Sequence, residues 1–185
     1  MTYHELVKAI ESYGCHAELG PSGLHNWGIE QNPHELATFL TAVGSFHSIL
    51  EIGTGYRAGL TRFLANVFAF QVTSVDIKNY GHDLHGATLI VLPPECPLWV
   101  SAQRFDVVLL DGPKEYYALK EAYEHYESYG KIVALHDIAG LRACQDVKRF
   151  WGEQSRYKNG RKKRGFHEVI ADGPAAAGLG WCRRG

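Results

Sequence analysis

The stretch Ser48-Ile-Leu-Glu-Ile-Gly-Thr-Gly55, with the run Val72-Thr-Ser-Val-Asp-Ile77 that follows it, decides the fold. The first predicts a short buried strand that ends in a glycine turn, and a helical pattern begins near Ala58. The second predicts another strand, with Asp76 at its C-terminal tip. Glycines at such a turn let the backbone approach a ligand, and the acid after the next strand reaches a ribose. The stretch therefore predicts a cavity for an adenosine-containing small molecule.

Strands and helices alternate along the rest of the chain. Apolar runs predict further strands over Ala87–Leu92, Phe105–Leu110 and Ile132–Leu135, with amphipathic helical patterns around them. Phe166–Ile170 and Leu179–Cys182 predict an antiparallel hairpin. This order predicts an α/β fold: a doubly wound, Rossmann-like, mostly parallel sheet with a C-terminal antiparallel hairpin.

We expect a single domain of three parts. These are an N-terminal helical extension (1–47), a cofactor-binding core (48–155) and the hairpin (165–184). Within the extension, Asn32-Pro33-His34-Glu35 predicts a helix start, because Asn caps, Pro occupies the first helical position and Glu the third.

Composition is that of a soluble globular protein, with 45% hydrophobic and 21% charged residues in 185. No apolar run approaches the roughly 20 residues that span a bilayer, and the N-terminus lacks the features of a signal peptide. The four cysteines are scattered without paired spacing, which favours reduced thiols. We therefore expect a cytoplasmic protein without a membrane partner.

Charge is distributed unevenly. Residues 1–155 carry 11 Lys and Arg against 18 Asp and Glu, whereas residues 156–185 carry 8 against 2. Six of those eight basic residues lie in the stretch Arg156–Arg164, which contains no acid. Such a run either attracts a nucleic acid or another anionic partner, or is a solvated loop, which is its commoner meaning.

Polar residues follow four of the predicted parallel strands, where doubly wound sheets bind their ligands. They are Gly53-Thr54-Gly55, Asp76, Asp111 and His136-Asp137. Because these strand ends meet at one edge of the sheet, we expect the residues to line one cavity.

The glycine turn alone leaves two ligands open. Gly53, Gly55 and Ala58 match the dinucleotide pattern G-x-G-x-x-G/A. Glu51 favours S-adenosylmethionine instead, because an acid there can interact with a cationic amino-acid group, whereas a pyrophosphate would disfavour it. The long helical segment before the first strand and the closing hairpin point the same way.

With these features the chain resembles the class I S-adenosylmethionine-dependent methyltransferases. It is most similar to the small bacterial and phage branch related to rhamnosyl O-methyltransferases and cephalosporin hydroxylase-like proteins. The resemblance spans about residues 29–152 and is carried by Gln31–Leu36, Ile49–Gly55, Phe105–Gly112, Ala134–Asp137 and Val147–Trp151.

The resemblance implies roles for named residues. Glu51, Gly53 and Gly55 would hold the methionine part of the cofactor, and Asp76 would accept hydrogen bonds from the ribose. The full set expected to bind cofactor is Glu51, Gly53, Thr54, Gly55, Tyr56, Asp76 and Asp111.

Asp111, His136 and Asp137 are the expected catalytic residues, with three interpretations open. Asp111 and Asp137 could hold Mg²⁺, which prefers oxygen ligands and lowers the pKa of a bound hydroxyl. Alternatively, His136 is a general base oriented by a carboxylate. In the third interpretation, His136 and Asp137 only cap the strand and order the following loop.

The expected function is methyl transfer to oxygen of a small or sugar-like acceptor. Two departures from the family bear on it: Val91-Leu-Pro-Pro-Glu95 follows the third strand, and Pro113-Lys114-Glu115 replaces a His-containing sequence. The two departures make a binding or structural module without catalysis one alternative. A nucleic-acid methyltransferase that uses the loop Arg156–Arg164 is another. A homo-oligomer stays open.

Overall fold

The computed structural model describes residues 1–13, 29, 31–81, 83–92, 103–140, 144–157, 159–172 and 176–184. In chain order the elements are α1 (Tyr3–Ser12), α2 (Pro33–Val43), β1 (Ser48–Ile52), α3 (Gly59–Phe68), β2 (Gln71–Asp76), β3 (Thr88–Val91), β4 (Phe105–Leu110), α4 (Tyr116–Tyr126), the 3-10 turn η1 (Glu127–Tyr129), β5 (Gly130–His136), α5 (Gln145–Ser155), β6 (Phe166–Val169) and β7 (Leu179–Arg183). Each predicted strand is present, with bounds that differ by a few residues at most. Glu95 lies outside the described residues.

One seven-stranded sheet runs through the molecule in the order β3-β2-β1-β4-β5-β7-β6. The first five strands pair in parallel, and β7 pairs antiparallel with both β5 and β6. The predicted α/β fold with a C-terminal antiparallel hairpin is confirmed. The strand order reverses between β1 and β4, so this is the switch point of the sheet.

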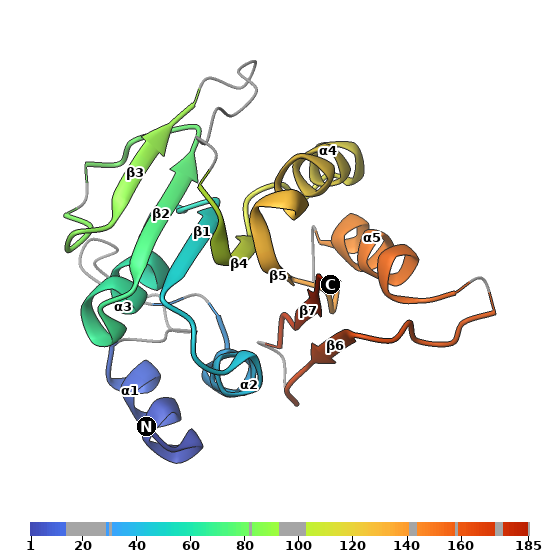
Figure 1. Ribbon diagram of the computed structural model, residues 1–185, viewed down its shortest axis with the longest axis horizontal. Coiled ribbons are helices and arrows are strands. Elements are labelled where there is room, and N and C mark those ends of the chain that lie inside the picture. Colours follow the sequence, from blue (N-terminus) through green and yellow to red (C-terminus); the bar gives the residue numbers. More distant parts are fainter. Residues whose placement is uncertain are drawn as a thin grey trace, which may run out of the picture.

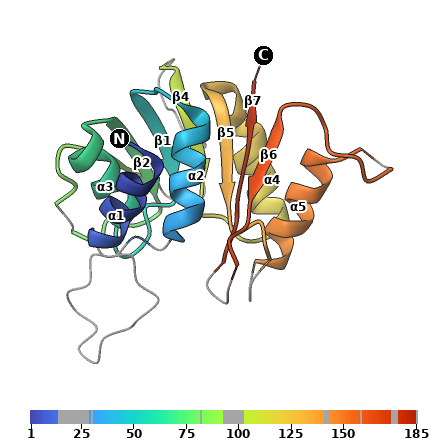
Figure 2. The same cartoon turned by 90° about the horizontal axis from the view of Figure 1, so that it is seen from below.

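Helices cover both faces of the sheet, as Figures 1 and 2 show. On one face, α1, α2 and α3 pack against alternate strand residues such as Val107 and Leu109. On the other, α4 and α5 pack against the intervening residues, including Val108 and Leu110. The apolar run Val107–Leu110 of β4 is thus buried on both sides, as a central parallel strand requires.

Helix α2 begins where the sequence predicts. The Asn32 side chain accepts hydrogen bonds from the backbone N–H groups of His34 and Glu35, at 2.9 and 3.4 Å. The buried Glu35 carboxylate in turn accepts from the backbone N–H groups of Ala171 and Gly178, at 2.8 and 2.9 Å. These bonds fix the start of α2 against the segments next to β6 and β7, and hence fix the position of Gln31.

Among the helices that the structure describes, none is both long and apolar enough to cross a membrane. The two described cysteines, Cys144 and Cys182, are free thiols. Cys15 and Cys96 lie outside the described residues.

Candidate active site

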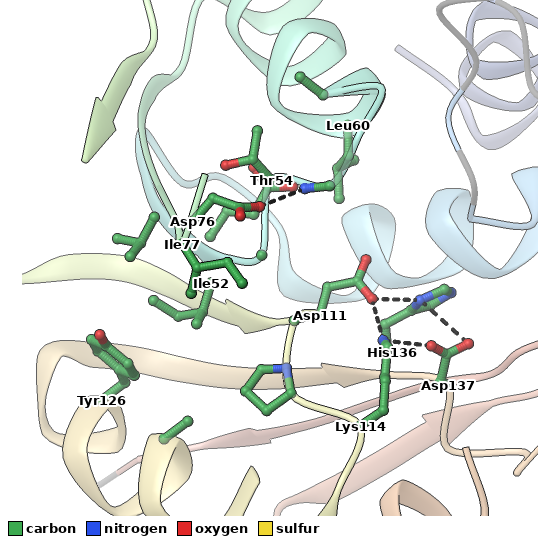
Figure 3. Close-up of a pocket in the computed structure, with 18 of the residues that line it drawn as sticks. Ile52, Thr54, Leu60, Asp76, Ile77, Asp111, Lys114, Tyr126, His136 and Asp137 are labelled. Atoms are coloured by element: carbon green, nitrogen blue, oxygen red, sulfur yellow. Dashed lines mark hydrogen bonds and ion pairs between the residues drawn. The ribbon is translucent and has the colours of Figure 1, made fainter. Parts of the chain in front are cut away.

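A cavity of about 760 Å³ opens at the carboxyl ends of β1, β2, β4 and β5. Its size lies within the range of small-molecule sites, roughly 300–1,000 Å³. Residues from all four strand ends line it, among them Gly53, Asp76, Asp111 and His136. Figure 3 shows Asp76 on one side of this cavity and the Asp111–His136 cluster on another. The expected convergence of the strand ends at a single site is therefore observed.

The glycine turn after β1 packs closely against the turn after β4. Gly53 has a φ of +98°, and a Cβ there would lie 2.4 Å from the Gly112 Cα. Gly55, at φ +69°, donates its backbone N–H to Asp76 Oδ2 at 2.9 Å. The other Asp76 oxygen accepts from the Lys78 backbone N–H at 3.1 Å. Asp76 is thus held at the cavity by backbone donors on two sides.

Glu51 lies beneath this turn and is only 2% exposed. Its Oε2 accepts hydrogen bonds from Thr61 and, at 2.9 Å, from Ser74, and the Ser74 hydroxyl lies 2.6 Å from that of Thr54. Burial raises the pKa of the Glu51 carboxyl to about 8, although these two hydrogen bonds oppose the rise. With this pKa, the carboxyl expected to meet a cationic ligand is mostly protonated at pH 7. It connects β1, β2 and α3.

Glu51→Gln is expected to change the pH dependence of stability. Because the folded pKa is about 8 and the ordinary value 4.5, the stabilising contribution of protonated Glu51 is complete below about pH 4.5. It is lost as the pH rises towards 8, with a slope of up to about 1.4 kcal/mol per unit. Urea unfolding of wild type and variant should therefore show that their difference in free energy of unfolding shrinks or changes sign between pH 5 and pH 8. The exposed substitution Glu11→Gln is the control, and a pH-independent difference for Glu51→Gln would refute a neutral carboxyl.

Four ionisable side chains form a compact cluster at the ends of β4 and β5 (Figure 3). Asp111 Oδ1 accepts from Lys114 Nζ at 2.8 Å and lies 2.9 Å from His136 Nδ1. Lys114 Nζ also lies 2.5 Å from Asp137 Oδ2. Gln31 donates from Nε2 to the second Asp111 oxygen at 2.5 Å. Every one of these residues lines the cavity.

Contacts within the cluster lower the pKa of Asp111 and raise those of Lys114 and His136. Burial opposes ionisation of Asp111, but the charges of His136 and Lys114 outweigh it and hold the Asp111 pKa well below its usual range. Burial likewise opposes the charged forms of Lys114 and His136. Their acidic neighbours, Asp111 first, outweigh this and raise both pKa values. His136 is thus the member whose ordinary pKa of 6.5 places its proton exchange nearest neutrality.

The structure does not bring every expected residue to the cavity. Glu51, Gly53, Thr54, Gly55, Asp76, Asp111, His136 and Asp137 line it. Tyr56 is not among the lining residues: it is 60% exposed and lies edge-on to Tyr80, with ring centroids 5.7 Å apart. Tyr80 does line the cavity, as do Gln31 and Lys114.

These three residues were given no role from the sequence. Gln31 stands directly before the predicted helix cap, within a stretch that carries the family resemblance. Lys114 stands where the chain departs from the family. Both positions carried a signal, but only the folded chain shows that the two side chains meet at Asp111.

The described residues of the basic stretch Arg156–Arg164, which exclude Lys158, lie toward the opposite end of the sheet from the cavity. This stretch connects α5 to β6, and β6 has the same direction as β5 because both pair antiparallel with β7. Phe166 at the start of β6 is level, across β7, with Val133 of β5, and Val169 at its end is level with His136, so the start of β6 points away from the carboxyl ends of the strands. Within the basic stretch, Arg156 and Lys162 both pair with Glu168, at 3.4 and 3.0 Å. Figure 2 shows this connection projecting at the edge of the molecule.

Solved structures share this architecture. The N-terminal domain of human METTL16 in complex with SAH matches with a TM-score of 0.56 and 11% identity, over 84% of this chain and 72% of that domain. A putative caffeoyl-CoA O-methyltransferase from Staphylococcus aureus matches with a TM-score of 0.57 and 15% identity, over 100% and 93%. The chain has the class I methyltransferase fold.

A third structure, Thermoplasma acidophilum 1320, matches with a TM-score of 0.54 and 12% identity, over 98% of this chain and 96% of its own. No protein-family model matches the sequence, and neither does any curated protein. The similarity is therefore one of fold. The narrower kinship to rhamnosyl O-methyltransferases and cephalosporin hydroxylase-like proteins stays a prediction.

Proposed function

We propose that the protein binds S-adenosylmethionine and transfers its methyl group to an oxygen of a small or sugar-like acceptor. One observation carries the proposal: a single cavity at the switch point has a glycine turn with a fixed carboxylate on one side and an acid–base cluster on the other. A cofactor bound between them would place its reactive end near the cluster.

The cofactor half of the cavity favours an adenosine ligand. Asp76 is oriented by the Gly55 and Lys78 N–H groups, so its carboxylate can accept hydrogen bonds from ribose hydroxyls. The backbone at Gly53 and Gly55 is open on the cavity side and would receive the methionine part. SAH, which is bound in the METTL16 structure, is what S-adenosylmethionine becomes after it has given up its methyl group.

The other half can supply the proton chemistry. S-adenosylmethionine would supply the methyl group: a bond from the acceptor hydroxyl oxygen to the methyl carbon would form as the carbon–sulfur bond breaks, with SAH as the neutral thioether product. The hydroxyl proton must then leave the acceptor. With Nδ1–H directed at Asp111, neutral His136 has its lone pair on Nε2, which has no hydrogen-bond partner among the described residues. We assign proton uptake to that atom, with Asp111 as the positioning residue.

Titration calorimetry tests the cofactor. S-adenosylmethionine should bind with one site per chain, and NAD should bind much more weakly or not at all. Asp76→Asn should weaken S-adenosylmethionine binding by about 10- to 100-fold, because a charge-assisted hydrogen bond contributes roughly 1.5–3 kcal/mol.

Asp83→Asn is the matched control, since the Asp83 side chain is 80% exposed. No binding of S-adenosylmethionine at millimolar concentration would refute the proposal. If S-adenosylmethionine binds but no SAH forms with any hydroxylated acceptor, the result would favour a binding module without catalysis. The position of Arg156–Arg164 away from the cavity does not favour methylation of a nucleic acid held by that stretch.

A further inference from the structure

We propose that the Lys114 ammonium is the resident cation of the acid–base cluster, and that it excludes a divalent metal from Asp111 and Asp137. The inference concerns the same cavity as the proposed function, but its test requires neither cofactor nor acceptor.

The candidate metal ligands are close together. One ligand atom from each of Asp111, His136 and Asp137 lies within 4.8 Å of the others. Mg²⁺ would need oxygen ligands at about 2.0–2.1 Å in octahedral geometry. Lys114 Nζ already lies 2.8 Å from Asp111 Oδ1 and 2.5 Å from Asp137 Oδ2. An ion bridging these two carboxylates would have to displace the ammonium.

The carboxylate of Asp111 is also fully engaged. Its Oδ1 receives Lys114 and faces His136, while its Oδ2 accepts from Gln31 at 2.5 Å. A metal would have to remove at least one of these donors. The residues as arranged therefore do not fit Mg²⁺, and no step of the proposed reaction uses it.

The fold places Lys114 there by local geometry. It stands three residues after Asp111, and the intervening Gly112 is packed against Gly53 at the switch point. Asp137, on the far side, has a φ of +65°, which few residues other than glycine adopt and which Asp tolerates better than most. The ion pair from Lys114 holds the Asp137 carboxylate in this position.

This arrangement changes how the acceptor would be held. Two of the three ammonium N–H groups are directed at Asp111 and Asp137, which leaves a third for an acceptor oxygen. A hydrogen bond from an ammonium requires a single oxygen, whereas a metal can hold two oxygens by chelation.

Mn²⁺ titration followed by electron paramagnetic resonance tests the assignment, because Mn²⁺ is a paramagnetic ion that takes the same oxygen ligands. Wild type should leave the free Mn²⁺ signal unchanged at millimolar concentration. Lys114→Ala should bind one Mn²⁺ at least about tenfold more tightly, since a like charge is removed from the site. Lys114→Arg keeps the charge and should behave as wild type does.

The double variant Lys114→Ala/Asp137→Asn should lose the gained site. Lys120→Ala, which removes an exposed lysine paired with Glu124 at 2.6 Å, is the control. If Lys114→Ala fails to fold by circular dichroism, Lys114→Met retains the side-chain stem and replaces it. Wild-type binding that disappears in Asp137→Asn would overturn the proposal. So would the absence of binding in a folded Lys114→Ala or Lys114→Met.

Discussion

His136→Asn is expected to lower the rate of SAH formation by about 10²- to 10⁴-fold, the usual contribution of a positioned general base. Asn can still donate a hydrogen bond to Asp111, as Nδ1 of His136 does, but it cannot take up a proton near neutrality. The affinity for S-adenosylmethionine should not change, because Asp76 and the glycine turn are untouched. The rate is measured as SAH formation by the protein in the presence of each of a panel of simple sugars and phenols. Calorimetry provides the affinity for S-adenosylmethionine.

The pH profile separates proton uptake from a structural role. Because Asp111 raises the pKa of His136, wild-type kcat/KM should rise with pH through a value above 6.5. His136→Asn should lose this rise, and the exposed control His47→Asn should keep it. An unchanged profile in His136→Asn would assign the proton to another group.

Gly53→Ala is expected to cost about 2–5 kcal/mol of stability and to abolish cofactor binding. The left-handed backbone disfavours an L-residue by about 1–2 kcal/mol. In addition, the new Cβ would meet the Gly112 backbone at 2.4 Å, and overpacking typically adds about 1–3 kcal/mol. Both sides of this contact are backbone atoms, so no side chain can move aside. Urea unfolding measures the loss.

Gly55→Ala separates the two causes. Gly55 also has a positive φ, but nothing lies within 4 Å of its hypothetical Cβ. It should therefore lose only the conformational part, about 1–2 kcal/mol. Equal losses in the two variants would mean that the contact between Gly53 and Gly112 is not tight.

Local sequence patterns predict most of the fold, because a short stretch of sequence is enough to indicate each helix or strand. The nearly all-apolar sequence of β4 predicts burial on both faces, and Asn32-Pro33 predicts the start of α2; the structure has both. The position of β7 between β5 and β6 could not be predicted in this way, because the two strands of a hairpin at a sheet edge have the same local sequence pattern in either order. That order depends on contacts between segments far apart in the sequence.

For the candidate site, the sequence predicts which residues come together but not how burial changes their properties. Alignment of strand ends brings Asp76, Asp111 and His136 to one cavity, and that follows from the parallel pattern alone. Burial changes what such residues do, and burial is a property of the whole fold. The sequence predicts that Glu51 interacts with the cationic end of the cofactor, but it does not show that burial raises the pKa of this carboxyl to about 8. Lys114 was noted as a departure from the family, but its position between two carboxylates required the loops after β4 and β5.

The position of β7 also constrains the order in which the sheet is completed. Strand β6 precedes β7 in the chain but pairs with the sheet only through it. Gly180 of β7 faces the Trp151 ring so closely that a Cβ would lie 2.5 Å from it, and Trp181 packs edge-on to Phe39. A chain cut before Leu179 would therefore leave β5 with an unpaired edge and β6 with no partner. Exposed strand edges of this kind template aggregation, so the last strand of the fold protects the middle of the sheet against self-association.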